Sequence, residues 1–251
     1  MGKFDATMIR DIVVVLVPMI LSLSVHEFAH AWSAHKLGDD TAASQGRMTL
    51  NPLAHIDLFG TILIPVFSVV MGGIGLIGWA KPVPISPHRF RRTVTMRTGM
   101  MITAVAGPLS NLIMALVTAG ALMFLFGDQI GALVSDPRIG SAFTAILLLG
   151  SSENAAVVVK AGLMTETQTI VILLLGRVFL MNVGLAVFNM LPVPPLDGSR
   201  LLPFSWQEKL ARYSLVAFVG FLLLINFAGG ILSGPVFFLG DLIVRFWSIF
   251  F

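Results

Sequence analysis

The sequence predicts an all-α polytopic membrane protein: a helical bundle of about four to six membrane segments, with a re-entrant segment and a short extended piece. Hydrophobic residues make up 56% of the chain and charged residues only 12%, with a mean hydropathy of +0.91. A soluble domain carries about twice that share of charge. Several apolar runs are long enough to cross a bilayer as helices. We therefore expect one membrane-embedded domain over residues 1–251, with a core at about 10–200 and C-terminal helices at 213–251.

The charge balance and the absence of cysteine narrow the possible partners and chemistry. The formal net charge of +3 and the pI near 9.7 fit basic cytoplasmic loops better than nucleic-acid binding. The lipid bilayer is thus the expected surrounding, and no nucleic acid is expected. Without cysteine the chain has no disulfides, thiolate ligands or cysteine nucleophile. Any metal must rest on histidine and carboxylate.

The first apolar run predicts a helix over about Arg10–Leu37, long enough for a tilted span. Pro18 is expected to kink it. A basic start before an apolar run also fits a signal peptide, but cleavage at the small residues around His30 would discard the run. We interpret it as a retained membrane helix. His35, near its end, is expected to be an interfacial residue and not a metal ligand.

A polar connector, residues 38–57, follows the first helix. Within it, Gly46–Leu50 is interpreted as a short extended piece. His55 and Asp57 lie just before the next apolar run. Two interpretations stay open for them: residues that line the site or add a ligand, and solvated loop residues.

Leu58–Gly78 is a run of mostly apolar residues interrupted by Pro65 and by glycines. Such interruptions suit a re-entrant hairpin as well as a full span. The next segment, residues 79–92, combines prolines with the run His-Arg-Phe-Arg-Arg. It is expected to be extended and strongly basic, and it is the best cytoplasmic marker in the chain.

A second span is predicted over about Thr98–Phe126. Near its start, Gly107–Asn111 brings small residues and an amide into the apolar helix, and both helix packing and substrate contact by Asn111 stay open. Residues 127–167 are mixed in character. Their apolar piece Ala142–Leu149 is too short to span, so we expect an interfacial or solvent-side segment.

A third span is predicted over about Thr169–Met190, and a proline-rich stretch follows it. The helix cannot continue there, so the backbone must unwind, which is tolerated where it lines a protein cavity. Asp197 is presented from that unwound end. The last part of the chain is expected to form one more span, to about Leu232, and a final piece in which Asp241 and Arg245 pair at i, i+4.

The chemistry enters through the stretch His26-Glu27-Phe28-Ala29-His30 inside the first apolar run, which is uncharged from Ile12 to Val25. Ionisable residues at membrane depth mark function by default. Histidines at i, i+4 lie on one helix face and can close on one metal ion. The glutamate beside them can handle the proton of an activated water. The simpler alternative is a buried histidine that hydrogen-bonds a neighbouring helix.

Catalytic zinc usually takes three protein ligands. With His26 and His30 as two of them, Asp197 is the first candidate for the third and His55 the second. His26 and His30 lie in the C-terminal half of their helix, and Asp197 follows the C-terminal end of another. These side chains reach the same depth in the membrane most easily if both helices run in the same direction and end on the cytoplasmic side. Because the basic loop that follows is also cytoplasmic, Leu58–Gly78 must then enter and leave on one side, as a re-entrant segment.

Three motifs in this order resemble the site-2 protease family of intramembrane zinc metalloproteases, in its compact prokaryotic branch without a PDZ or CBS domain. They are His26–His30, Gly107–Asn111 and Asn189–Gly198, and the resemblance covers about residues 10–200. It implies one Zn²⁺ per chain, a catalytic acid/base, and an active site near the cytoplasmic face of the membrane. The implied metal ligands are His26, His30 and Asp197, the implied acid/base is Glu27, and the implied substrate-binding residues are Asn111 and Asn189, to which His55 is added as a weaker candidate.

The resemblance further implies a metalloendopeptidase in a prokaryotic cell (inner) membrane. Its substrate would be a membrane protein cut in or near a transmembrane helix. Helix carbonyls are hydrogen-bonded, so we expect local unwinding or strand-like pairing with Gly46–Leu50. One alternative is a non-proteolytic zinc-binding protein or transporter, although holding a metal requires no base such as Glu27. A di-iron hydroxylase needs several histidine boxes, whereas this chain has five histidines and one clean box.

Overall fold

The structure is a computed structural model that describes residues 6–71, 78–135, 140–149, 164–213, 216, 220 and 229–251. All regular secondary structure in these ranges is helical, which confirms the predicted all-α membrane fold. The longer helices are α1 (Ala6–Lys36), α4 (Met96–Val134), α5 (Ala142–Leu149), α7 (Glu166–Asn189), α8 (Phe204–Arg212) and α10 (Gly229–Trp247). The shorter ones are α2 (Thr41–Ser44), η1 (Pro52–Ala54), η2 (Leu58–Leu63), α3 (Ile64–Val70), η3 (Pro87–Arg89) and η4 (Asp197–Leu201).

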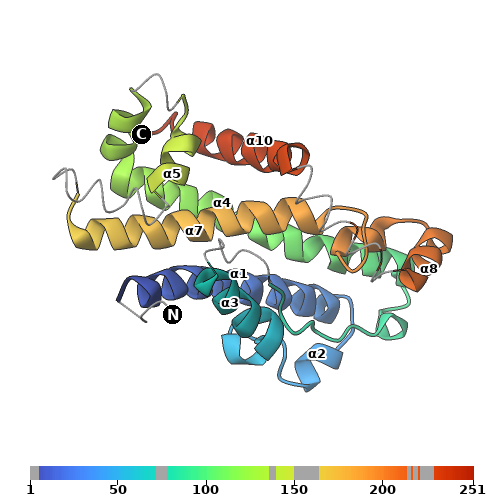
Figure 1. Cartoon of the computed structure of the whole chain (residues 1–251). Helices are drawn as coiled ribbons and strands as arrows, with labels where there is room; N and C mark the ends of the chain where they lie inside the picture. The colour runs from blue at the N-terminus through green and yellow to red at the C-terminus, as the bar shows by residue number, and fades with distance from the viewer. Residues whose placement is uncertain are drawn as a thin grey trace.

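Three of the described helices, α1, α4 and α7, are long and apolar enough to cross a membrane. They pack against one another as one bundle, with α4 and α7 side by side and α1 along both (Figure 1). In Figure 1, α1 and α7 run in the same direction and α4 runs in the opposite one. The C-terminal ends of α1 and α7 therefore lie at the same end of the bundle, as a site shared by His30 and Asp197 requires.

The second predicted span is longer in the structure than in the sequence analysis. The expected end, Phe126, is a single break with φ −135° and ψ 19°, and α4 resumes beyond it to Val134. The continuation is favoured by packing, because Ile130 within it is 1% exposed and belongs to the main apolar cluster. Apolar contacts thus extend the helix into residues whose mixed composition did not predict a span.

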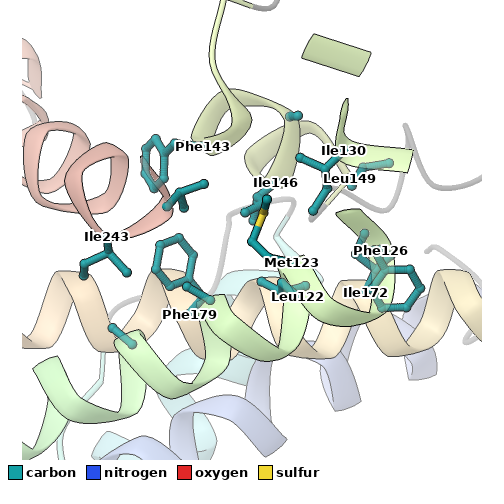
Figure 2. Packing of buried hydrophobic residues seen from close by; sticks show 14 of the residues in the cluster. Leu122, Met123, Phe126, Ile130, Phe143, Ile146, Leu149, Ile172, Phe179 and Ile243 are labelled. Atoms are coloured by element: carbon teal, nitrogen blue, oxygen red, sulfur yellow. The ribbon is translucent and has the colours of Figure 1, made fainter. Parts of the chain in front are cut away.

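That main apolar cluster joins α4, α5, α7 and α10 (Figure 2). At its centre Phe143 of α5 makes edge-to-face contacts with Phe179 and Phe237, at ring-centroid distances of 5.9 and 5.3 Å. A Cβ atom on Gly240 would come within 2.2 Å of the Phe143 ring, so only glycine lets α10 approach this closely. The helix at Ala142–Leu149 is short, as predicted, but it is packed into the protein core, and its solvent-side interpretation is wrong.

The segment after the polar connector turns back on itself. The continuous helical run of η2 and α3 covers Leu58–Val70, which at 1.5 Å per residue reaches about 20 Å and cannot cross a bilayer core. The chain returns beside its own start: the Trp79 N–H donates to the Gly60 carbonyl at 3.2 Å, and the Thr61 hydroxyl donates to the Trp79 carbonyl at 2.8 Å. The meeting of these two ends is what the re-entrant prediction requires, and residues 72–77 between them lie outside the described residues.

Two other predictions concern the connector and the C-terminal region. Residues 46–50 form a turn and bends, with a φ of +67° at Gly46, so the predicted extended piece is wrong. The span expected from Tyr213 to Leu232 lies largely outside the described residues. The ion pair of the final piece is present in α10, where Arg245 Nε donates to Asp241 Oδ2 at 2.5 Å.

Candidate metal centre

The two histidines of α1 face each other across one helical turn, inside the bundle. Both are 4% exposed, and their Nε2 atoms lie 3.0 Å apart. The ring planes are nearly perpendicular, with an interplanar angle of 87°. The i, i+4 spacing therefore brings two imidazole nitrogens to one point.

Asp197 reaches the same point from the unwound end of α7. Its Oδ2 atom lies 3.1 Å from His26 Nε2 and 3.2 Å from His30 Nε2. The next residue, Gly198, allows this placement, because a Cβ atom there would come within 2.3 Å of the Met190 carbonyl oxygen. Among the described residues these three form the group of histidine and carboxylate side chains that could hold a metal ion.

A chain of amides across three helices fixes the protonation of His26. Asn182 Nδ2 donates to the Val178 carbonyl at 2.7 Å and to Ser22 Oγ at 2.8 Å, so its Oδ1 faces Asn111. Asn111 Nδ2 donates to that oxygen at 2.8 Å, which turns Asn111 Oδ1 towards His26 Nδ1 at 2.6 Å. Because an amide oxygen only accepts, His26 carries its proton on Nδ1 and leaves Nε2 as a free lone pair.

The same reasoning holds for His30. Its Nδ1 atom lies 2.6 Å from the Thr103 carbonyl, an acceptor, so Nδ1 donates and Nε2 is unprotonated in the neutral ring. Two lone pairs and the Asp197 carboxylate thus converge with no donor between them, an arrangement that calls for a cation. A tetrahedral zinc with bonds of about 2.0–2.1 Å separates its ligands by roughly 3.3 Å, close to the three spacings here.

The environment of Asp197 keeps it ionised. Burial alone would raise the pKa of its carboxyl, but whenever His26 or His30 takes up a second proton on Nε2, that imidazole donates a hydrogen bond and brings a positive charge to Asp197, and both effects bring that pKa well below its ordinary value. The carboxylate is the form that binds a metal ion.

Gly107 of α4 makes room for the imidazole pair. A Cβ atom at this position would come within 2.4 Å of His30 Nε2 and 2.6 Å of His26 Cε1. The helices can therefore carry the centre only if α4 has no side chain at this residue. The glycine of the Gly107–Asn111 motif thus serves the metal-binding geometry directly.

Glu27 lies beside the centre and is 8% exposed. Its Oε2 atom accepts the backbone N–H of Val83 at 2.8 Å, from the segment that follows the re-entrant hairpin. No other hydrogen bond to its carboxylate is found within the described ranges, so Oε1 is available to a water or a substrate.

The structure places the remaining predicted residues in different roles. His55 is 2% exposed and its Nε2 atom lies 2.8 Å from the Thr49 carbonyl, and it is not in the group formed by the other three metal candidates. Asp57 caps η2 through the Phe59 and Gly60 N–H groups. Asn189 is half-buried as the last residue of α7. His35 lies near the surface, with Nδ1 2.5 Å from Asp40 Oδ1, in keeping with its interpretation as a non-ligand.

Sequence reasoning missed Asn182, although a signal was present. It is fully buried, and like Asn111 it is a polar side chain in the middle of an apolar span. Such residues face the bundle interior and bond across helices. Ser22 and the Thr103 carbonyl gave no comparable signal, because neither a serine in an apolar run nor a backbone carbonyl stands out in a sequence.

Comparison with known proteins decides the family. The sequence model of peptidase family M50 matches residues 14–227. This chain belongs to peptidase family M50. It is 32% identical over 213 residues to YwhC of Bacillus subtilis (strain 168), named as a zinc metalloprotease, with 83% of this chain and 78% of YwhC covered. It is 30% identical over 259 residues to Rip2 of Mycobacterium tuberculosis (strain ATCC 25618 / H37Rv), also named as a zinc metalloprotease, covering 95% and 82%. No solved structure matches.

Membership of M50 agrees with the expectation drawn from the motifs. The protein is a zinc metalloprotease, and its apolar helices make it an integral membrane protein. The three converging acceptors supply a centre that suits Zn²⁺.

Proposed function

We propose that this M50 protein hydrolyses peptide bonds in or near the transmembrane segments of membrane-protein substrates. The observation that carries the proposal is the convergence of His26, His30 and Asp197 between apolar helices, with Glu27 beside them. A hydrolytic centre between such helices has lipid-embedded chains as its nearest substrates. The whole of residues 1–251 then forms one membrane-embedded protease domain.

The roles follow from the contacts. His26, His30 and Asp197 would hold one zinc ion, which when bound supplies Lewis acidity to activate a water and polarise the scissile carbonyl. Glu27 takes the proton of the attacking water on the carboxylate oxygen that Val83 leaves free. It then passes this proton to the nitrogen of the leaving amine as the peptide bond breaks.

We rank the candidate substrate-binding residues by their burial and by the hydrogen bonds that their side chains already make within the protein. Asn111 is fully buried and its amide already contacts His26, Asn182 and the Ser22 carbonyl, so we assign it to orienting His26. Asn189 is half-buried at the end of α7, near the stretch that delivers Asp197, and is the better candidate for substrate contact. The enclosed position of His55 makes it the weaker one.

We place the active site towards the cytoplasmic side of a prokaryotic cell membrane. The end of α1 that carries the histidines also carries the exposed Lys36, and the exposed Arg91 is tied to it through its N–H bond to the Leu37 carbonyl. Exposed cations at the end of a span favour the cytoplasm. This orientation is consistent with a hairpin at residues 58–79 that enters and leaves on one side.

The decisive experiment is Glu27→Gln in the full-length protein, reconstituted with a single-span membrane protein as substrate. We expect hydrolysis to fall by about 10²–10⁴-fold, because the amide cannot take the water's proton. Zinc content should stay near one ion per chain. Glu166→Gln, an exposed acid-to-amide change at the start of α7, is the matched control. Undiminished hydrolysis by Glu27→Gln would contradict the assignment, and zinc flux without any cleavage would favour a transporter.

Local unwinding of the substrate helix is a second prediction. Carbonyls within a helix are hydrogen-bonded and closed to attack, so a substrate with Gly or Pro near the cut should be cleaved faster than the same span without them. The measurement is the ratio of kcat/KM for such a matched pair of substrates. Equal values would show that unwinding does not limit the reaction.

A further inference from the structure

The segment that returns from the re-entrant hairpin crosses α1 next to the metal centre. We call residues 79–86 the strap. It is fastened at both ends: the Trp79 N–H donates to the Gly60 carbonyl at 3.2 Å, and the Ser86 N–H donates to Asp39 Oδ2 at 2.6 Å. Between these points it donates a hydrogen bond to α1 at Glu27 itself, through the Val83 N–H.

The donors of the strap alternate along the chain. Trp79, Lys81 and Val83 give their N–H groups to the Gly60 carbonyl, the His55 carbonyl and the Glu27 carboxylate respectively. In extended backbone, alternate N–H groups point to the same edge. The N–H groups on one edge of the strap therefore all bond to the protein, and their three acceptors fix its position along the chain direction.

Prolines occupy the positions between these donors. Pro82 and Pro84 have no N–H, so the opposite edge has no donor at these two residues, and their rings fix φ near −65°. A stiff chain whose alternate donors at residues 79, 81 and 83 all bond to the protein suits the task of holding a partner in place. It is poorly suited to pairing with a substrate strand, which needs donors on its free edge.

Asp39 anchors the far end of the strap with an unusually complete set of bonds for a buried acid. It is 0% exposed, and besides the Ser86 N–H it accepts the Thr41 N–H at 3.0 Å and the Thr41 hydroxyl at 2.5 Å. Its own N–H donates to the Ala34 carbonyl in the last turns of α1. The helix that carries Glu27 thus also carries, through Asp39, the anchor that positions the strap.

We propose that the strap is a positioning device for the acid/base, in which the Val83 N–H fixes the orientation of the Glu27 carboxylate and Asp39 seats the strap. The inference rests on the proposed role of Glu27. With Oε2 held by Val83, the direction of Oε1 is set before substrate arrives. Val83 and Asp39 are positioning residues, since each acts on Glu27 only through the hydrogen bonds that hold the carboxylate and the strap.

The test compares two changes at one residue. Val83→Pro removes the N–H but keeps a residue of similar volume, whereas Val83→Ala keeps the N–H and shortens the side chain. We expect Val83→Pro to lower kcat by about 10–100-fold, since a small misplacement of a catalytic group costs that much. KM should stay within about twofold and zinc near one ion per chain. The kcat of Val83→Ala should exceed that of Val83→Pro by at least about tenfold.

A second pair acts on the anchor. Asp39→Asn replaces one acceptor oxygen by a donor in front of the Ser86 or Thr41 N–H, and Asp40→Asn makes the same chemical change at the exposed neighbour. We expect a lower kcat, with KM and zinc content kept, for the first variant only. If Val83→Pro fails to fold or loses zinc, this pair decides the question: unchanged kcat in Asp39→Asn overturns the proposal.

The outcomes separate this inference from the proposed function. Full kcat in Val83→Pro, or equal losses in Val83→Pro and Val83→Ala, would overturn the positioning role while the loss in Glu27→Gln still supports the protease. If zinc-loaded wild-type protein cleaves no membrane-spanning substrate, the proposed function itself fails.

Discussion

Two regions of the bundle hold the same pair of helices, α4 and α7, in different ways. Around α5 and α10 the contact is an apolar cluster, with Phe143 and Phe179 buried at its centre. Around α1 it is a chain of hydrogen bonds through Asn111 and Asn182. On α7 the two regions are represented by adjacent residues, since Val183 belongs to the apolar cluster and Asn182 belongs to the polar chain.

The two regions should respond differently to substitution of a side chain. Apolar contacts are individually small and non-directional, so a packed cluster responds to lost volume in proportion to the gap. A buried polar chain is directional, and each member left without its partner is costly in a low-dielectric interior. We therefore expect changes in the apolar cluster to reduce stability and changes in the polar chain to reduce zinc affinity, and the predictions below test that separation.

The largest effect is expected for Asp197→Ala. Removing the carboxylate leaves two imidazole nitrogens and takes away the charge of the acceptor group, so zinc binding and hydrolysis should both be lost. The thermal unfolding of the zinc-free protein should change little, because the apolar cluster is untouched. Zinc content by elemental analysis and unfolding in detergent measure the two. Retained stoichiometric zinc would show that another donor completes the centre.

The second effect is expected for Phe143→Ala, in the apolar cluster. The lost ring leaves a cavity between α5, α7 and α10, and truncations of this kind cost about 3–5 kcal/mol. The zinc affinity of the folded protein should stay the same, because the ring contacts of Phe143 are made to Phe179 and Phe237 within the apolar cluster. A competitive chelator titration checks it. A parallel loss of zinc affinity would show that the two regions are coupled.

The smallest effect is expected for Asn182→Leu, in the polar chain. Without Asn182 the Asn111 amide loses its closest acceptor and is freer to flip, which weakens its hold on the His26 tautomer. Loss of such an outer partner typically costs about 10–100-fold in metal affinity or activity. Thr118→Val is the matched control, since that buried hydroxyl bonds the Met114 carbonyl of its own helix. Equal behaviour of both variants would contradict the relay.

The helices and the candidate ligands could be predicted because both are marked by local patterns. Long apolar runs predicted α1, α4 and α7, and His26, Glu27 and His30 stood out because ionisable groups are costly inside an apolar helix. The errors concern packing. Ala142–Leu149 looked like a surface segment because its own stretch is short, yet its burial depends on helices far along the chain.

The sequence by itself determined which elements are apolar helices, where the third span has to unwind, and which side chains could hold a metal. Spacing along the chain and the cost of charge in lipid fix these things locally. The tertiary structure alone decided that Asn111 faces His26, that Asn182 locks it, and that the Val83 N–H reaches Glu27. Hydrogen bonds between residues 56 to 85 positions apart depend on how helices cross, and no local pattern encodes that crossing.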